Sequence, residues 1–212
     1  MDDLEQSERV REWLRTNGSA ITTGLVIGLA GIVGWQWWQH SQQQHRLDAA
    51  NTFQAMQRAV DGGDTAQFEQ LAGELGDSFA KTPYGTLALL QLADEKVGQG
   101  DLEAATHALE QATRVAQNPA LTGLAQLRLA RLQLAAAQPQ AALDTLARLP
   151  ADDFSGLAAE LRGDALMALQ RQDEAEAAYE DALSKLETGA PNRTIVQMKL
   201  ADLGVAESEP GA

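Results

Sequence analysis

Short turn-forming sequences recur through most of this 212-residue chain at intervals of about 35 residues. Between them lie stretches of roughly 12–18 residues whose apolar side chains return every three or four positions, as in helices with one buried face. No stretch shows sustained alternation of apolar and polar residues, so the sequence predicts an all-α chain. The turns are Asp61–Asp64, Gly98–Asp101, Ala137–Gln140 and Gln170–Asp173, and softer breaks lie at Pro83, Pro119, Pro150 and Pro191.

The recurrence aligns four copies of one pattern, in which small or apolar residues fall at the same place. We expect about four helical hairpins over residues 47–188, within a repeat domain of residues 39–204. Residues 192–203 are predicted to form a last helix that caps the stack, and residues 205–212 a disordered tail. The equivalent positions are Phe68, Ala105, Ala142 and Ala175 on the second helices, and Met56, Ala93, Ala130 and Gly163 on the first.

The last copy carries the strongest resemblance to a known repeat. Gly163, Ala175, Tyr179 and Ala182 hold small, small, aromatic and small residues at the spacing of tetratricopeptide repeats. This copy lacks the tryptophan and the closing proline of that family, and the copies spaced by 37 residues are longer than its norm. The resemblance implies an α-solenoid, and a generic helical bundle is the alternative.

A segment free of Lys, Arg, Asp and Glu extends from Thr16 to His45. Its apolar part, residues 20–38, is long enough as a helix to reach roughly 28 Å, about the hydrocarbon thickness of a bilayer. Trp35, Trp37 and Trp38 stand where the helix would leave the membrane. We therefore predict one uncleaved transmembrane helix. A cleaved signal peptide would need small residues after the apolar run, and a buried core helix would not carry exposed tryptophans.

The distribution of Arg around this segment predicts its orientation. Arg9, Arg11 and Arg15 precede the segment, and Arg46 alone follows it closely. Residues 1–19 are therefore expected in the cytoplasm and the chain after Trp38 on the other side of the membrane. A ridge of small residues, Ala20, Gly24, Gly28 and Gly31, suits close packing against another membrane helix, although glycine is also simply common in such helices.

The composition argues against several classes of function. Acidic residues outnumber basic ones by 30 to 16, for a net charge of −14, so we expect no nucleic-acid binding. The chain has no cysteine. Histidine occurs only at His40, His45 and His107, and no catalytic or nucleotide-binding motif is present. Asp152-Asp153 is expected to cap a helix. We predict no enzyme, no metal site and no cofactor.

A polypeptide-binding groove is the remaining candidate site. In tetratricopeptide stacks the first helix of each hairpin lines the concave face, and mixed leucine and charge suits an extended or partly folded chain. The alternative is that the leucines are inter-helix core, since a register error of one residue moves them inward. No repeat shows the dense Lys and Arg set that clamps a terminal carboxylate. The predicted groove residues are Leu90, Asp94, Leu127, Arg131, Glu160, Asp164 and Met167.

The whole chain resembles the YfgM-type ancillary subunits of the Sec translocon. The resemblance rests on the Arg9–Leu14 stretch before the apolar segment, the Trp35–Trp38 exit and the four repeat-like hairpins. It implies a single-pass protein of the bacterial inner membrane, with the repeat domain in the periplasm. The implied partners are Sec translocon subunits, a membrane-anchored periplasmic prolyl-isomerase-like chaperone, exported polypeptides and membrane lipid. A structural scaffold of another envelope complex, such as outer-membrane assembly or division, is the alternative.

Overall fold

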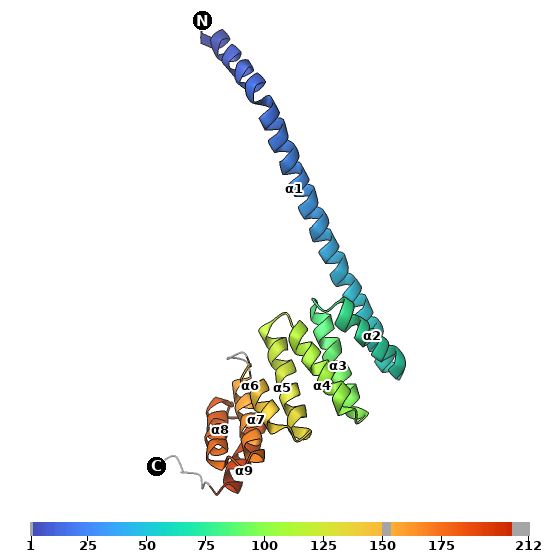
Figure 1. Cartoon of the computed structure of the whole chain (residues 1–212), viewed down its shortest axis with the longest axis vertical. Helices are drawn as coiled ribbons and strands as arrows, with labels where there is room; N and C mark the ends of the chain where they lie inside the picture. The colour runs from blue at the N-terminus through green and yellow to red at the C-terminus, as the bar shows by residue number, and fades with distance from the viewer. Residues whose placement is uncertain (1, 150–153, 205–212) are drawn as a thin grey trace. The chain divides into compact units, whose positions relative to one another are not determined.

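The computed structural model describes the backbone of residues 2–149 and 154–204, and the side chains of residues 27–29, 31–149 and 154–204. These residues form helices joined by short connections, and none of them forms a strand, so the all-α prediction is confirmed (Figure 1). The helices are α1 (Asp2–Asp61), α2 (Thr65–Ser78), α3 (Pro83–Gly98), α4 (Leu102–Val115), α5 (Pro119–Ala135), α6 (Pro139–Leu146), α7 (Ser155–Ala168), α8 (Gln172–Lys185) and α9 (Pro191–Asp202).

The chain divides into two units, Met1–Asp48 and Ala49–Ala212. In the first unit, the described part of α1 exposes most of the surface of its large apolar side chains, among them Ile32, Trp35 and Trp37. Within the described residues, no helix combines the length and the hydropathy that a bilayer crossing requires. The predicted membrane helix covers residues 20–38, of which the side chains at 20–26 and 30 lie outside the described residues. The side chains of residues 1–19, Asp152-Asp153 and the predicted tail also lie outside them.

In the second unit, the helices follow one another as antiparallel hairpins (Figure 1). The end of α1 packs with α2, α3 with α4, α5 with α6, and α7 with α8, while α9 covers the last hairpin. Each predicted turn joins the two helices of one hairpin. The residue that reverses the chain has a positive φ in all four turns: Gly63, Gly100, Ala137 and Gln170.

Local side chains define where many of these helices begin. Asp64 and Asp101 accept hydrogen bonds of 3.0 Å from the backbone N–H groups of Gln67 and Ala104 at the starts of α2 and α4. Asn118 accepts one of 2.8 Å from Leu121 at the start of α5, where Pro119 is the first helical residue. These caps satisfy N–H groups that have no partner inside the helix.

The core includes the residues that the repeat alignment made equivalent. Phe68, Ala105, Ala142 and Ala175 on the second helices are buried, and so are Met56, Ala93, Ala130 and Gly163 on the first. Leu109, Leu146 and Tyr179 are buried one turn further along the second helices and fill the space toward the next hairpin. The tetratricopeptide-like register is therefore confirmed across all four hairpins.

Glycine at position 163 is a packing requirement. A Cβ atom built on Gly163 would lie 2.3 Å from Cε1 of the Tyr179 ring, so no larger residue fits without moving the tyrosine. The bare backbone of α7 lets the aromatic ring of α8 lie directly against it. This contact explains why a small residue and an aromatic residue occur together in the last copy.

Candidate polypeptide-binding face

The first helices of the hairpins present a polar surface that we call the first-helix face. Its members belong to the end of α1 and to α3, α5 and α7. The predicted groove residues Asp94 and Arg131 are exposed on it, and Asp164 and Met167 are half-buried. Leu90 and Leu127 are only 3% and 5% exposed and belong to the core between the helices. The alternative interpretation, inter-helix core, therefore describes these two leucines, and a groove on this face depends on the other residues.

Polar pairs connect neighbouring first helices across the face. Arg128 Nη1 on α5 donates a hydrogen bond of 2.6 Å to Asp94 Oδ2 on α3. Gln57 Nε2 on α1 donates one of 2.9 Å to Gln91 Oε1 on α3. Each pair joins residues 34 positions apart, which is about one repeat. The face is therefore lined by groups whose hydrogen bonds run between hairpins.

The C-terminal end of the face contains two carboxylates held by α9. Lys199 Nζ lies 3.0 Å from Glu160 Oε1 and 2.7 Å from Asp164 Oδ1, and Asn192 Nδ2 donates a hydrogen bond of 3.0 Å to Glu160 Oε2. The Glu160 side chain is only 10% exposed. A buried carboxylate needs such compensation because removing a charge from water is costly. We call Glu160, Asp164, Tyr179, Asn192 and Lys199 the α7–α9 network.

Tyr179 connects this network to the packing of the last hairpin. Its hydroxyl donates a hydrogen bond of 2.8 Å to Asp164 Oδ1, and Lys199 Nζ lies 5.7 Å from the centre of its ring. Burial, reinforced by the hydrogen bond to Asp164, raises the pKa of Tyr179 well above its ordinary value. Burial alone would lower the pKa of Lys199, but hydrogen bonds to Asp164 and Glu160 outweigh burial and raise that pKa.

Glu160, Asp164 and Asp94 were predictable from the sequence, but their partners were not predicted. Lys199 and Asn192 lie on the helix predicted only as a cap, and Arg128 lies three residues before Arg131, the predicted groove residue. The repeat length was the feature of the sequence that could have indicated these partners. Arg128 is 34 residues after Asp94, and Lys199 is 35 residues after Asp164. Opposite charges one repeat apart on successive first helices meet because those helices are neighbours in the stack.

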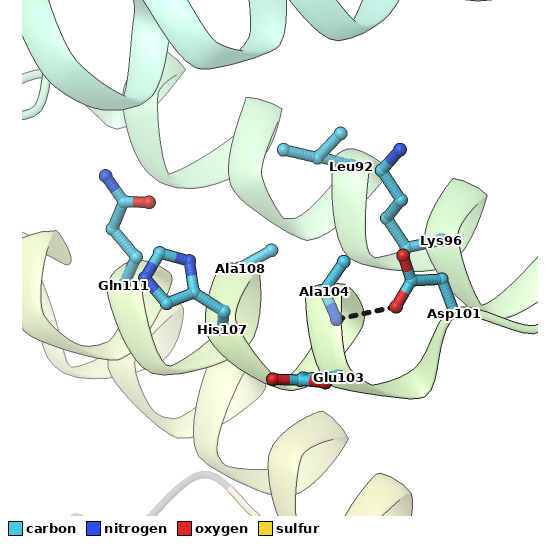
Figure 2. A pocket seen from close by; sticks show the side chains of 8 residues that line it. All are labelled: Leu92, Lys96, Asp101, Glu103, Ala104, His107, Ala108 and Gln111. Atoms are coloured by element: carbon cyan, nitrogen blue, oxygen red, sulfur yellow. Dashed lines mark hydrogen bonds between the residues drawn. The ribbon is translucent and has the colours of Figure 1, made fainter.

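A cavity of about 430 Å³ lies between α3 and α4 (Figure 2). Three of the polar side chains that line it, those of Asp101, Lys96 and Gln111, already have partners within the protein. Asp101 caps α4 through Ala104, as the dashed line in Figure 2 shows, and Lys96 Nζ lies 2.6 Å from Glu69 Oε1 on α2. Gln111 Nε2 donates a hydrogen bond of 3.1 Å to Asp77 Oδ1. We assign no chemistry to this cavity.

The other predicted features have these positions in the structure. His107 is exposed on α4, and Gly28 and Gly31 are exposed on α1 with open space around an added Cβ. The side chains of Ala20 and Gly24, the other members of the predicted packing ridge, lie outside the described residues. Among the residues that the structure describes, no three His, Cys, Asp or Glu side chains gather where they could hold a metal ion.

Comparison with known proteins decides the family. Residues 11–205 match a family model described as a tetratricopeptide repeat-like domain. A protein of Escherichia coli strain K12, named ancillary SecYEG translocon subunit, is 30% identical over 96% of this chain and 98% of its own length. The chain belongs to this family of tetratricopeptide-like ancillary SecYEG translocon subunits. Relatives with the same name are 27% identical in Haemophilus influenzae, over 86% of this chain and 89% of the relative, and 22% identical in Neisseria gonorrhoeae, over 96% and 98%.

The family assignment confirms the resemblance found in the sequence. The matched region includes all four hairpins and α9. The alignments cover 98% of the length of the relatives from Escherichia coli and Neisseria gonorrhoeae.

Proposed function

We propose that this protein is a membrane-anchored subunit beside the SecYEG translocon that holds newly exported polypeptides without catalysing a reaction. The name shared by its relatives supports the association with the translocon and with the inner membrane. The observation that carries the holding role is the first-helix face, where exposed Asp94 and Arg131 lie on successive hairpins of a repeat solenoid. In this proposal residues 1–19 lie in the cytoplasm, residues 20–38 cross the membrane and the repeat domain lies in the periplasm.

The proposed groove is open at its centre and occupied at its C-terminal end. Glu160 and Asp164 are bound by Lys199 and Asn192 of α9, so we place the client on Arg131, Met167 and Asp94, whose side chain pairs with Arg128 but stays 64% exposed. Such a surface suits weak binding of many sequences, because few of its side chains are apolar. Anchoring next to the channel raises the local concentration of clients, which compensates for weak affinity.

We also propose that a membrane-anchored periplasmic chaperone of the prolyl-isomerase type is a partner of this protein. Its support is the resemblance of the whole chain to the YfgM-type subunits.

Photo-crosslinking tests the groove. A photoreactive amino acid replaces Arg131 on the first-helix face or, as a matched control, Glu180, which is exposed on α8. In intact membranes that are exporting a labelled secretory protein, we expect adducts with that protein from position 131 and none from position 180. Equal yields at both positions, or adducts from neither, would contradict the groove.

An aggregation assay separates holding from scaffolding. We expect the purified full-length chain in detergent to suppress the aggregation of a urea-denatured exported protein. A protein that served only as a scaffold of an envelope complex would copurify with its partners but leave this aggregation unchanged.

The membrane anchor has its own test. Gly28→Arg places a charge near the middle of residues 20–38 and is expected to cost about 3 kcal/mol of insertion free energy. We expect this variant to be extracted from membranes by alkaline carbonate. Gln42→Arg, which adds the same charge beyond the predicted span, should stay in the membrane pellet. Alkali-resistant association of the Gly28→Arg variant would argue against the span.

A further inference from the structure

The last helix, α9, occupies the place of a first helix in the stack. Lys199 Nζ on α9 lies 2.7 Å from Asp164 Oδ1 on α7, as Arg128 on α5 pairs with Asp94 on α3. The two pairs join residues 35 and 34 positions apart, so each pair spans about one repeat. Helix α9 therefore follows the fourth hairpin as α5 follows the second.

One side of α9 is filled by the hairpin that precedes it. Val196 and Leu200 are 0% and 8% exposed and belong to one core cluster with residues of α8. Their equivalents on α5 are Ala125 and Leu129, which belong to one core cluster with residues of α4, the preceding second helix. The alignment of Lys199 with Arg128 therefore agrees with the packing.

The same alignment identifies the side of α9 that a second helix of its own would cover. Met198 and Ala201 lie on this side. Their equivalents are buried against the second helix of the same hairpin, which is α6 for α5 and α4 for α3. The equivalents are Leu127 and Ala130 on α5, and Leu90 and Ala93 on α3.

On α9 this side is exposed. Met198 is 56% exposed, more than any other large apolar side chain described in the second unit, and Ile195, one turn earlier, is 42% exposed. Ala201 is exposed as well. The last repeat of a solenoid usually has a polar outer face, because no further repeat covers it. The described stack instead ends on an apolar surface, which has the pattern of a first helix without its partner.

The surface of α8 beside this position is acidic. Glu180 on α8 is equivalent to Glu110 on α4, which lines a cavity that α6 also lines, so Glu180 is on the side where a further second helix would lie. Glu176 is equivalent to Glu69, which pairs at 2.6 Å with Lys96 of the next hairpin. Neither Glu176 nor Glu180 forms an ion pair with a described residue. A helix that docks here is therefore expected to supply basic residues.

We propose that α9 is the first helix of an incomplete fifth hairpin, which an amphipathic helix of a partner protein completes. The partner helix has small apolar residues toward α9, as Ala105 and Ala142 have on α4 and α6, and basic residues toward α8. A second copy of α9 fits less well, because it presents Ile195 and Met198 where second helices have alanine. The inference does not depend on the proposed client groove, whose residues lie on other helices.

Peptide binding to the full-length chain in detergent tests the proposal. The probe is a fluorescein-labelled copy of α4, Leu102–Val115, held helical by a hydrocarbon staple on its outer side. Lysine replaces His107 and Gln111, which line the cavity toward α2 and so correspond to the side that would meet α8. We expect fluorescence anisotropy to show that this peptide binds at least fivefold more tightly than the same peptide with glutamate at both positions, because the flanking surface of α8 is acidic.

Variants of the protein locate the site. Met198→Glu should weaken binding of the lysine peptide at least tenfold, because it places a charge in the apolar contact. Its melting temperature should stay unchanged, since this side chain is exposed. Val97→Glu, at a side chain that is 45% exposed on α3, is the matched control and should leave binding unchanged. Equal binding by the Met198→Glu and Val97→Glu proteins would overturn the proposal.

Exchanging the charges on α8 tests the expected orientation. The protein with both Glu176→Lys and Glu180→Lys should prefer the glutamate peptide over the lysine peptide. A merely structural role of these residues would change the binding of both peptides alike. A preference for the lysine peptide that survives the exchange would overturn the proposal.

Light scattering tests whether a second copy covers α9 instead. We expect the polypeptide mass of the full-length chain in detergent to be the same for the unchanged protein and for Met198→Glu. A dimer that Met198→Glu dissociates would overturn the proposal, because another copy of this chain would then cover α9.

Discussion

Replacing Lys199 by methionine is expected to destabilise the C-terminal end of the repeat domain by about 2–4 kcal/mol. Methionine keeps the apolar stem of lysine but removes the cation from between Glu160 and Asp164. The Glu160 side chain is 10% exposed, so its charge would be left largely buried without compensation. The value lies at the lower end for a buried pair, because the Lys199 side chain itself is 27% exposed. Urea denaturation and hydrogen exchange at Val196 and Leu200 of α9 measure the effect.

Lys185→Met is the matched control for this prediction. Lys185 pairs with Asp181 on the same helix at 2.6 Å, but both side chains are more exposed, at 40% and 37%. Its loss should cost less than about 0.5 kcal/mol, because water screens exposed pairs. If Lys199→Met has no larger effect than Lys185→Met, the α7–α9 network does not hold α9 in place.

Alkaline pH should reproduce part of the Lys199→Met effect. The pKa of Lys199 is raised above its ordinary 10.5 and that of Tyr179 above its ordinary 10.0. A raised folded-state pKa means that the stabilisation is complete below the ordinary value and is lost as the pH rises toward the folded-state value. The free energy of unfolding should therefore fall above about pH 10, and it should fall less steeply in the Lys199→Met protein.

Replacing Gly163 by leucine is expected to destabilise the last hairpin by about 4 kcal/mol. The first added carbon would already lie 2.3 Å from the Tyr179 ring. The leucine can be accommodated only if Tyr179 leaves its site, where it is 3% exposed and bonded to Asp164. The hairpin then loses the burial of an aromatic side chain together with this hydrogen bond. Thermal and urea denaturation, followed by circular dichroism, measure the change.

A pair of glycine-to-alanine changes separates this clash from helix propensity. Gly163→Ala should destabilise by about 1–3 kcal/mol, because even one methyl group displaces the ring. Gly73→Ala, inside α2 with nothing within 4 Å of the added carbon, should stabilise by roughly 0.5–1 kcal/mol. If Gly163→Ala is also stabilising, the contact between Gly163 and Tyr179 does not constrain the packing.

The tertiary structure was needed to decide which residues face a neighbouring hairpin and are buried there. Leu90 and Leu127 were predicted on the groove and are buried, because each first helix packs on its own partner and on adjacent hairpins, so apolar residues cover more than one of its faces. Periodicity in the sequence cannot distinguish these faces. For the same reason, the sequence could not show that Lys199 meets Glu160 and Asp164.

The sequence by itself determined the helices, their turns and the repeat register. These depend on local physics: Asp64, Asp101 and Asn118 cap the helices that follow them, and Gly63 and Gly100 supply the positive φ that reverses the chain. Small residues at constant spacing then determine which helix surfaces approach closely, as Gly163 does for Tyr179. Only the tertiary structure decided which polar groups from different hairpins meet. Those contacts depend on how rigid hairpins stack, and a shift of one residue turns a helix by about 100°.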